Sequence, residues 1–530
     1  MRPGRNAFFV LALFFFAVQL PASIRLMNGV NLGGNLGVYF ENYSMKGREG
    51  RRPPNTFRIR FTPSISFLGM TFGINTDFFY TSEGEQRIVT QPINRISLNP
   101  AWNWGKVYLG NFPPRFSDLI LQGVTLRGGG LDLHPGIFRL FLVGGRSKRE
   151  CEDSIGRSFR RYLYGIRVGI GKKIRTALSL IKVRDDPHSI ENPGDLLPQE
   201  NLVSAFGFVL SFLRKRFDLE GEAAASVHTR DLNSPELDTA KVPGIVKSLM
   251  KPRHSTRADF AYKLRAKLRV WLAKFDLSYR YLGPGFTSLG LASSHNDYRK
   301  YRGKVSFAPA KGLRFELAYE DKRNNLLGDK LATAKSQSYS GRFRYSRPGL
   351  VAFNIAYHEA RVRNESEDSL RSSFERVSSL RFDPAFAISY WKQQTLRLGI
   401  AAERSVKEDA ADTSETSSIK FSADYSLQMT KDFTPSLGIY FMQTRTDGGE
   451  SGFIYYTLGA GLRVSKAGLN VALSYAPLEG GSDIKFSLRG SYKLGRFGSL
   501  RAAWRLRRYS SENSSDYTES RMSLSYSVVL

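Results

Sequence analysis

The sequence has little cysteine and histidine, and it lacks the patterns that usually carry catalysis or metal binding. Its one cysteine, Cys151, excludes an intramolecular disulfide framework. The six histidines are scattered and show no zinc-ligand spacing, so we expect no metal and no cofactor. No Gly-x-Ser-x-Gly turn occurs and no serine has a convincing histidine partner, so we do not expect an enzyme.

Beyond its first residues the sequence also lacks the run of about 18 apolar residues that a membrane helix needs. Its beginning is typical of a secretory signal, with Arg2 and Arg5, an apolar run over 7–18, and small residues at Ala22 and Ser23. We therefore expect a signal peptide over 1–23. No linker or shift in composition divides the remainder, so residues 24–530 are expected to form one domain.

Negative charge is scarce relative to positive charge, and the formal net charge is +30. Such a charge often indicates a nucleic-acid partner, because phosphate neutralisation needs clustered lysine and arginine. Here the cations occur mostly at alternate positions rather than in a tail or on one helix, and the signal directs the chain to export. We therefore expect no nucleic-acid partner.

The most regular pattern is an alternation of charged and apolar residues. Over 261–272, the residues Lys263, Arg265, Lys267 and Arg269 stand at every second position, with apolar residues between them. An extended strand sends alternate side chains to opposite faces, so one face would be cationic and the other apolar. The pattern recurs to the end of the chain with almost no helical stretch to cover it, which favours strands between lipid and water.

Counting such runs gives about 26 strands, within a range of 24–26. Tight turns alternate along the chain with long polar loops, among them 44–54, 145–158, 185–200, 230–257 and 283–297. The predicted fold is all-β: a single large transmembrane antiparallel β-barrel with short periplasmic turns and longer extracellular loops. A soluble β-sandwich is the competing interpretation, but one of this length would leave open sheet edges. Two placements are open for the longest loop, 230–257: a mobile one at the surface, which is the usual one for a loop, and an inward one that narrows the lumen.

Basic residues dominate the predicted water-facing positions. An arginine at mid-membrane on the lipid side costs about 2–4 kcal/mol, so these residues are assigned to the lumen. Cross-strand carboxylates can neutralise part of this charge, and the candidates are Asp276, Glu316, Glu320, Glu403 and Asp424. The candidate lumen-lining residues are Arg58, Arg60, Lys263, Arg265, Lys267, Arg269, Arg302, Lys304, Arg342, Arg344, Lys485 and Arg489. Two roles are open for these residues: they select anions, or they only keep the wall of a wide barrel hydrated.

The end of the chain carries a family resemblance. Met522, Leu524, Tyr526, Val528 and Leu530 alternate with mostly polar residues. In this the chain resembles bacterial outer-membrane β-barrel proteins of the porin-like kind, although Leu530 stands where a terminal aromatic residue is usual. The resemblance implies location in the bacterial outer membrane and insertion by the barrel-assembly machinery. It also implies contact with outer-membrane lipid and lipopolysaccharide.

Two kinds of function fit this fold. A passive channel for small solutes with modest anion preference is favoured by the basic lumen. A translocon or scaffold for export of lipid or protein is the alternative, with any accessory protein unknown. An energy-coupled receptor is disfavoured, because alternation begins too early in the mature chain to leave room for a plug of about 100 residues.

Overall fold

The computed structural model describes most of the chain. The described residues are 25–27, 30–82, 94–153, 156–171, 174–213, 216–237, 244–293, 296–347, 351–366, 368, 372–388, 392–409, 412–478, 480–512 and 514–529. The predicted signal peptide, 1–23, lies outside them, and so does the terminal Leu530. Strands account for 77% of the described residues and helices for almost none. The fold is therefore all-β, as predicted.

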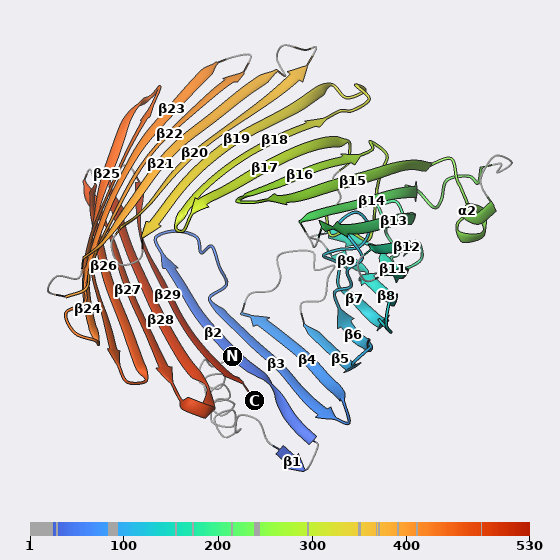
Figure 1. The fold of residues 1–530 in the computed structure, drawn as a ribbon, viewed down its shortest axis with the longest axis horizontal. Coiled ribbons are helices and arrows are strands. Elements are labelled where there is room, and N and C mark those ends of the chain that lie inside the picture. The colour runs from blue at the N-terminus through green and yellow to red at the C-terminus, as the bar shows by residue number, and fades with distance from the viewer. Residues whose placement is uncertain are drawn as a thin grey trace. The chain divides into compact units, whose positions relative to one another are not determined.

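The strands follow one another along the chain with few interruptions (Figure 1). In the N-terminal part they are β1 (Arg25–Met27), β2 (Val30–Lys46), β3 (Asn55–Phe67), β4 (Met70–Thr81), β5 (Arg95–Trp102), β6 (Gly105–Phe112), β7 (Leu126–Leu133), β8 (Phe138–Lys148), β9 (Cys151–Asp153) and β10 (Gly156–Ser158). The middle part contains β11 (Arg160–Ile170), β12 (Ile174–Asp186), β13 (Glu200–Phe212), β14 (Phe217–Thr229), β15 (Thr256–Val270), β16 (Ala273–Leu282), β17 (Tyr298–Ala310), β18 (Leu313–Asn324), β19 (Ala332–Arg347) and β20 (Val351–Ser366). The C-terminal part contains β21 (Ser373–Ile388), β22 (Gln394–Asp409), β23 (Thr413–Leu427), β24 (Phe433–Thr446), β25 (Gly449–Val464), β26 (Ala467–Leu478), β27 (Gly481–Lys493), β28 (Ser499–Ser511) and β29 (Ser514–Val529).

These strands form one antiparallel sheet that closes on itself. The sheet has 27 strands, of which β1 adds to β2 while the other 26 make a closed barrel. Closure comes from the pairing of β2 with β29, which runs from Asn35 opposite Val529 to Lys46 opposite Thr518. The prediction of about 26 antiparallel strands is confirmed. Strands β9 and β10 form a separate two-stranded sheet.

Two compact units can be distinguished within the sheet. The first comprises residues 1–112, 426–438 and 455–530, and the second comprises 113–425 and 439–454. In the first unit, Val38, Tyr526 and Val528 form a buried cluster at the seam of β2 and β29, with Leu36, Phe57, Leu494 and Leu500 packed around it. The Tyr526 hydroxyl also donates to the Phe497 carbonyl at 2.7 Å.

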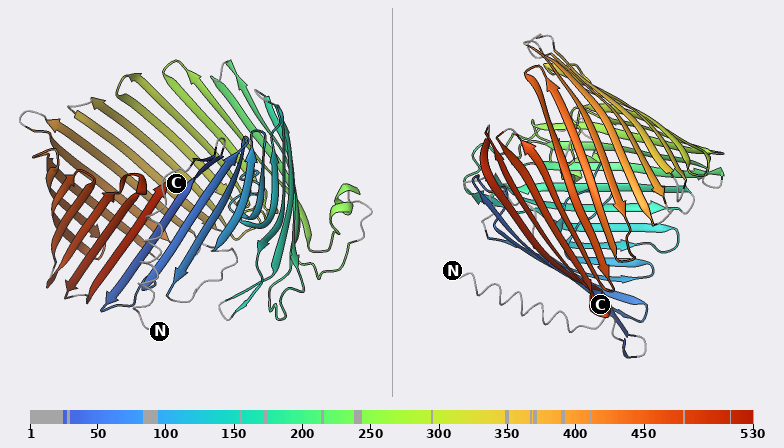
Figure 2. Two further views of the ribbon diagram at one scale, coloured as in Figure 1. Left: turned by 90° about the horizontal axis from the view of Figure 1, so that it is seen from below. Right: turned by 90° about the vertical axis from the view of Figure 1, so that its left-hand side faces the viewer.

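Helical structure is minor. The described helices are α2 (Gly244–Leu249) and the 3-10 turn η3 (Gly495–Phe497). Neither they nor any other helix among the described residues is long and apolar enough to cross a membrane. Most neighbouring strands are instead joined directly by hairpin connections (Figure 2).

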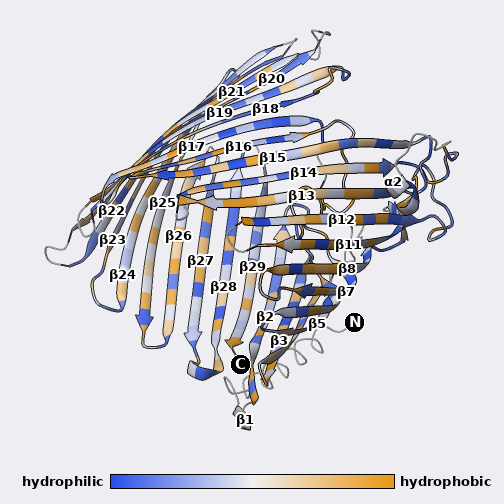
Figure 3. Cartoon of the chain, turned by 45° about the vertical axis from the view of Figure 1, so that its right-hand side comes forward, coloured by the Kyte–Doolittle hydropathy of each residue, from blue (hydrophilic) through white to orange (hydrophobic). Residues whose placement is uncertain are grey.

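The strands carry the predicted alternation of polar and apolar residues (Figure 3). Successive residues point to opposite faces and cross-strand partners share a face, so the register carries the division from strand to strand. We call the face with side chains such as Leu264, Leu277 and Leu317 the apolar face, and the opposite one the polar face. In the first unit the apolar face carries Phe78, Leu458 and Met522.

Candidate functional site

The twelve predicted basic residues all fall on the polar face. In the second unit, Lys263, Arg265, Lys267 and Arg269 stand opposite Arg280, Ser278, Asp276 and Lys274, and the pairing through β16 and β17 places Arg302, Lys304, Arg342 and Arg344 on the same face. In the first unit, the pairing from β27 through β29 to β3 does the same for Lys485, Arg489, Arg58 and Arg60.

Carboxylates neutralise many of these cations. Eight of the twelve have an ion pair, through Arg58–Asp77 (2.6 Å), Arg60–Asp77 (3.3 Å), Lys263–Glu222 (2.7 Å), Arg265–Asp276, Lys267–Glu220 (2.8 Å), Arg302–Glu320 (4.0 Å), Lys304–Glu316 (3.2 Å) and Lys485–Asp483 (3.3 Å). Arg269, Arg342, Arg344 and Arg489 are exposed and have no ion pair with a described residue. The wall therefore retains an excess of positive charge.

Four of the five predicted carboxylate partners make ion pairs. Asp276, Glu316 and Glu320 pair with predicted wall residues, and Glu403 pairs with Lys420 at 3.3 Å. These pairs join neighbouring strands of a hairpin, where the register fixes which side chains meet. Asp424 makes no ion pair with a described residue.

The polar face is not polar everywhere. On β11 to β14, the positions that face this side carry Leu163, Ile181, Val203 and Ala224, each of them buried. We call this part, with β8, the covered wall. Because the other face of these strands is apolar and exposed, for example at Leu178, the covered wall is apolar on both faces at these four positions. Something other than water must therefore lie against its polar side.

Two connecting segments provide that cover. Residues 113–125 join β6 to β7, and residues 283–293 lie between β16 and β17; we call them the cover segments. Leu119, Ile120 and Leu121 of the first, and Phe286 of the second, are fully buried. Phe116 packs on Phe141 of β8 with ring centroids 5.4 Å apart. Burial of this apolar surface holds the first segment on the wall.

Hydrogen bonds tie the two cover segments to each other. The Gln122 amide donates to the Gly290 carbonyl and the Ala292 amide donates to the Gln122 carbonyl, both at 3.1 Å. The Ser288 hydroxyl donates to the Ile120 carbonyl at 2.6 Å. Gly290 is required at this crossing, because a Cβ there would lie 2.5 Å from the Ile120 carbonyl oxygen. The segments thus form one layer.

Asn201 fixes this layer to the wall. It is fully buried on β13, its side-chain amide donates to the Thr287 carbonyl at 3.0 Å, and its side-chain oxygen accepts from the Leu289 amide at 3.0 Å. A buried amide that satisfies two backbone groups of the second cover segment is costly to lose. The second segment is therefore held by polar contacts as well as by Phe286.

Asp118 anchors the edge of the cover where the wall becomes charged. Its two carboxylate oxygens accept from Lys263 of β15 and Arg280 of β16, and Lys263 also pairs with Glu222. Burial alone would raise the pKa of Asp118, but the Lys263 ammonium and the Arg280 guanidinium outweigh it and hold that pKa below its ordinary value of 3.8. Asp118 is therefore ionised at neutral pH. Of the predicted basic residues, Lys263 thus serves to hold a segment on the wall.

Of the two placements open for 230–257, the described part of the loop does not take the inward one. Lys182 donates to the Leu249 carbonyl, and Lys182 points away from the buried Ile181 and Val183, toward the apolar face of β12. Glu236 and Arg253 pair within the loop at 3.6 Å. The loop and α2 therefore lie on the side of β12 opposite to the cover segments. The segments that lie against the polar face are 113–125 and 283–293 instead.

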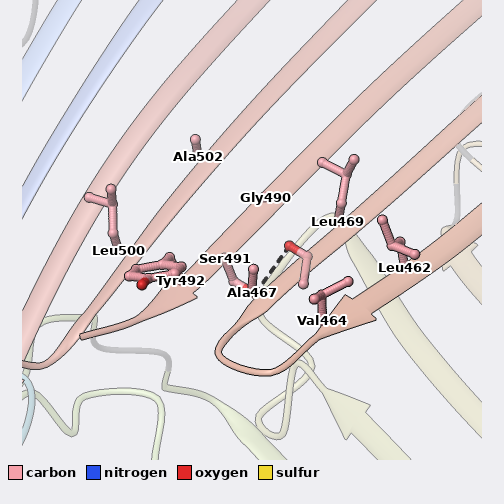
Figure 4. A pocket seen from close by; sticks show the side chains of 10 residues that line it. Leu462, Val464, Ala467, Leu469, Gly490, Ser491, Tyr492, Leu500 and Ala502 are labelled. Atoms are coloured by element: carbon pink, nitrogen blue, oxygen red, sulfur yellow. Dashed lines mark hydrogen bonds between the residues drawn. The ribbon is translucent and has the colours of Figure 1, made fainter. Parts of the chain in front are cut away.

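The apolar face has a hollow in the first unit. A cavity of about 310 Å³ opens over β25 to β28, where small residues Gly490 and Ala502 form its floor (Figure 4). Leu462, Leu469 and Leu500 line it. Among its lining residues only Ser491 and Tyr492 carry a polar side-chain group. Such a hollow suits a hydrocarbon chain better than a polar solute.

Metal chemistry finds no support in the described residues, where no group of three histidine, cysteine or acidic side chains is placed to hold an ion. Cys151 is buried and begins β9, where it pairs with Ser158 of β10.

No family model matches the sequence. No curated protein matches it either. Solved structures do: the P pilus usher (PapC) translocation pore is 9% identical with a TM-score of 0.36 and covers 94% of this chain and 99% of that one. PapC in an E. coli P pilus tip assembly intermediate is 11% identical, with a TM-score of 0.47 and coverage of 94% and 60%. Acinetobacter baumannii OccAB3 is 11% identical, with a TM-score of 0.32 and coverage of 67% and 98%.

These chains are bacterial outer-membrane β-barrels, the class that the sequence resembles, and no narrower family is assigned. Their identities and TM-scores are too low for their functions to be transferred.

Proposed function

We propose that this protein is a passive outer-membrane channel whose polar face lines a water-filled lumen. The observation that carries the proposal is the exposure of large apolar side chains over a whole face: Leu178 and Leu317 are each 64% exposed and Leu458 is 63% exposed. A soluble protein seldom exposes apolar patches this extensive. Lipid is the medium that such a face fits, and water on the other side then fits the charged residues.

Aromatic and apolar residues support this orientation. Rings on the apolar face contact one another in rows, such as Tyr279 with Tyr301 at 4.6 Å and Phe315 with Phe343 at 4.7 Å between centroids. Aromatic rows of this kind suit the boundary between hydrocarbon and head groups. Trp271 at the tight turn between β15 and β16 is 90% exposed. An exposed tryptophan at a turn fits an anchor at the second boundary.

The excess of cations on the wall supports a modest preference for anions. Charges on a pore wall select by sign, and Arg269, Arg342, Arg344 and Arg489 have no ion-paired carboxylate among the described residues. A barrel with well over 16 strands should leave an aqueous channel unless segments fold into it. Because the Debye length is about 8 Å at physiological salt, wall charge cannot control the centre of a wide pore. The preference should therefore be weak.

The cover segments fit the same function as fixed elements that narrow the lumen along β8 and β11 to β14. They are held by a small apolar core and by Asp118, so they should move little on the time scale of solute passage. The channel should consequently conduct less than a barrel of its strand number would if it were empty.

Reversal potentials of the purified full chain in a planar bilayer, measured under a salt gradient, test this proposal. We expect stable conductance and a reversal potential on the anion side that grows as the salt concentration falls. Cation preference would contradict the assignment of the basic wall to the lumen. Absence of conductance would favour the alternative, a translocon or scaffold that opens only for lipid or protein cargo.

Insertion by the barrel-assembly machinery and contact with lipopolysaccharide belong to the same proposal. The alternating residues of β29 fit the first, and the apolar face fits the second. Chemical labelling of intact cells at an engineered cysteine in the 325–331 connection would test the location. Labelling in intact cells is expected; labelling only after lysis would contradict it.

A further inference from the structure

Four cations lie side by side on the apolar face, at the ends of β17 to β20. Arg299 stands opposite Arg323, Arg323 opposite Lys335, and Lys335 opposite Arg363. Like charges directly opposite one another on neighbouring strands are destabilising. We call these four residues the cationic row. A row of this kind should persist only if negative charge is supplied to it.

The protein supplies that charge unevenly. Within the row, Lys335 pairs with Glu365 at 2.6 Å. Three cations outside the row at this end of the face also have carboxylate partners, in the pairs Arg361–Glu359 (2.7 Å), Arg376–Glu359 (3.0 Å) and Arg404–Glu415 (2.7 Å). Arg299 and Arg323 have no ion pair with a described residue, and the Nε atom of each is buried without a hydrogen-bond partner. An unpaired buried donor on a charged group is costly. The Nε donor of each of these two arginines is therefore left without an acceptor among the described residues.

The surroundings of the row indicate where that acceptor comes from. Next along the same face lie Tyr301 on β17 and, opposite it on β18, Asp321, whose carboxylate accepts from the Gln337 side-chain amide at 3.2 Å. Tyr319 and Leu317 follow on β18, and Tyr301 and Tyr319 are both exposed. Tyrosine in an apolar face fits the head-group level of a membrane, with the hydrocarbon beyond it. The row then lies at the height of lipid phosphate groups. It crosses four strands, or about 14 Å, which is wider than one phosphate.

We propose that the cationic row binds the phosphate groups of lipid A, the phosphorylated glycolipid of lipopolysaccharide, with Arg299 and Arg323 as its principal donors. The proposal relies on the proposed function only in that the apolar face meets the membrane. Arginine is suited to this task because its planar guanidinium donates two parallel hydrogen bonds to a phosphate. A lipid is favoured over free phosphate because its acyl chains would cover the exposed Leu317. A head group with two phosphates would span more of the row than one with a single phosphate.

The test measures binding of lipid A to the purified full chain in detergent, by native mass spectrometry, with the fully phosphorylated lipid and the same lipid without its phosphates. We expect only the first to bind tightly. The double variant Arg299→Gln, Arg323→Gln should bind it about 30-fold more weakly. The matched control, Arg302→Gln with Lys322→Gln, removes the same charge from the same two strands on the polar face and should bind as the unaltered chain does.

Three results would overturn the proposal: equal binding by the double variant, equal binding of the lipid without phosphates, or binding of inorganic phosphate alone as tight as that of lipid A. Thermal unfolding in lipid-free detergent guards against a folding defect, because relief of repulsion within the row should leave the double variant as stable as the unaltered chain or more stable. Lipid A is expected to raise the unfolding temperature of the unaltered chain and to have little effect on the double variant. Conductance is a separate measurement, so a channel that fails to conduct but binds lipid A would refute only the proposed function.

Discussion

Strands β11 to β14 and strands β17 to β20 pair in the same antiparallel way and share an exposed apolar face, yet their polar faces differ. The first group presents Leu163, Ile181 and Val203 to the cover segments. The second, which we call the open wall, presents residues such as Arg302, Glu320 and Arg342. Each face thus matches what lies against it. Alternation between polar and apolar residues is kept only where the two faces meet different media.

The strongest test of this comparison places a charge on each wall. Ile181→Lys would bury an unpaired ammonium beneath the cover segments, whereas Ser338→Lys would add one to the open wall. We expect the first change to destabilise the protein by about 3 kcal/mol or more and the second by less than about 1 kcal/mol. Urea-induced unfolding, followed by heat-modifiable gel migration, measures both. Equal destabilisation would mean that the cover segments do not exclude water from the wall.

A smaller effect is expected from loosening the edge of the cover. Asp118→Asn removes the carboxylate that Lys263 and Arg280 share, and because Asp118 is only 37% exposed in its side chain, the loss should cost about 1–2 kcal/mol. We expect more frequent steps to higher conductance and faster cleavage by chymotrypsin within 113–125. The control is Asp383→Asn, which removes the 2.7 Å partner of Arg381 where no cover segment lies. If the two variants show conductance steps equally often, Asp118 does not hold the cover segments on the wall.

The same anchor predicts a pH dependence. Because the pKa of Asp118 is lowered by folding, its contribution to stability is present above its ordinary value of 3.8 and is lost as the pH falls through the still lower folded value. Conductance steps should therefore be unchanged between about pH 5 and pH 8 and become frequent only below about 3.8. Single-channel recordings across this range, with Asp118→Asn as the reference, measure it. A rise in the frequency of conductance steps near neutral pH would mean that a group other than Asp118 holds the cover segment on the wall.

The smallest effect concerns the open wall alone. Arg342→Gln with Arg344→Gln removes two exposed cations that have no ion-paired carboxylate among the described residues, so the reversal potential should move toward zero by a few millivolts. Arg361→Gln, on the apolar face of β20, should leave it unchanged. A shift of the same size in both variants would show that the two faces are not separated as proposed.

Much of the fold could be predicted from sequence because two media impose a period of two. In β15 the alternation of Lys263, Leu264 and Arg265 is enough to define both faces, and hairpin connections fix which strands are neighbours. The carboxylate partners Asp276 and Glu316 were predictable for the same reason. These inferences depend only on residues close together in the chain.

The cover segments were not predicted, because their contacts are not local. The apolar run Leu119-Ile120-Leu121 and the lack of charge facing it on β12 and β13 were signals, but nothing in the sequence joins 113–125 to 283–293. The inward alternative for 230–257 rested on its length and on an amphipathic piece. Its real contact, from Lys182 to the Leu249 carbonyl, depends on the tertiary position of β12.

The pairing of β2 with β29 has a consequence for how the chain must fold. Partners such as Glu41 and Arg521 are 480 residues apart, whereas partners in a hairpin such as Arg265 and Asp276 are 11 apart. Closing the longer loop costs about 3 kcal/mol more in chain entropy, and it cannot begin before the last strand has been synthesised. Until then β2 presents an unpaired edge that could join any other exposed strand. Whatever inserts this barrel must therefore shield that first edge until β29 pairs with it, and a chain truncated before β29 should aggregate through it.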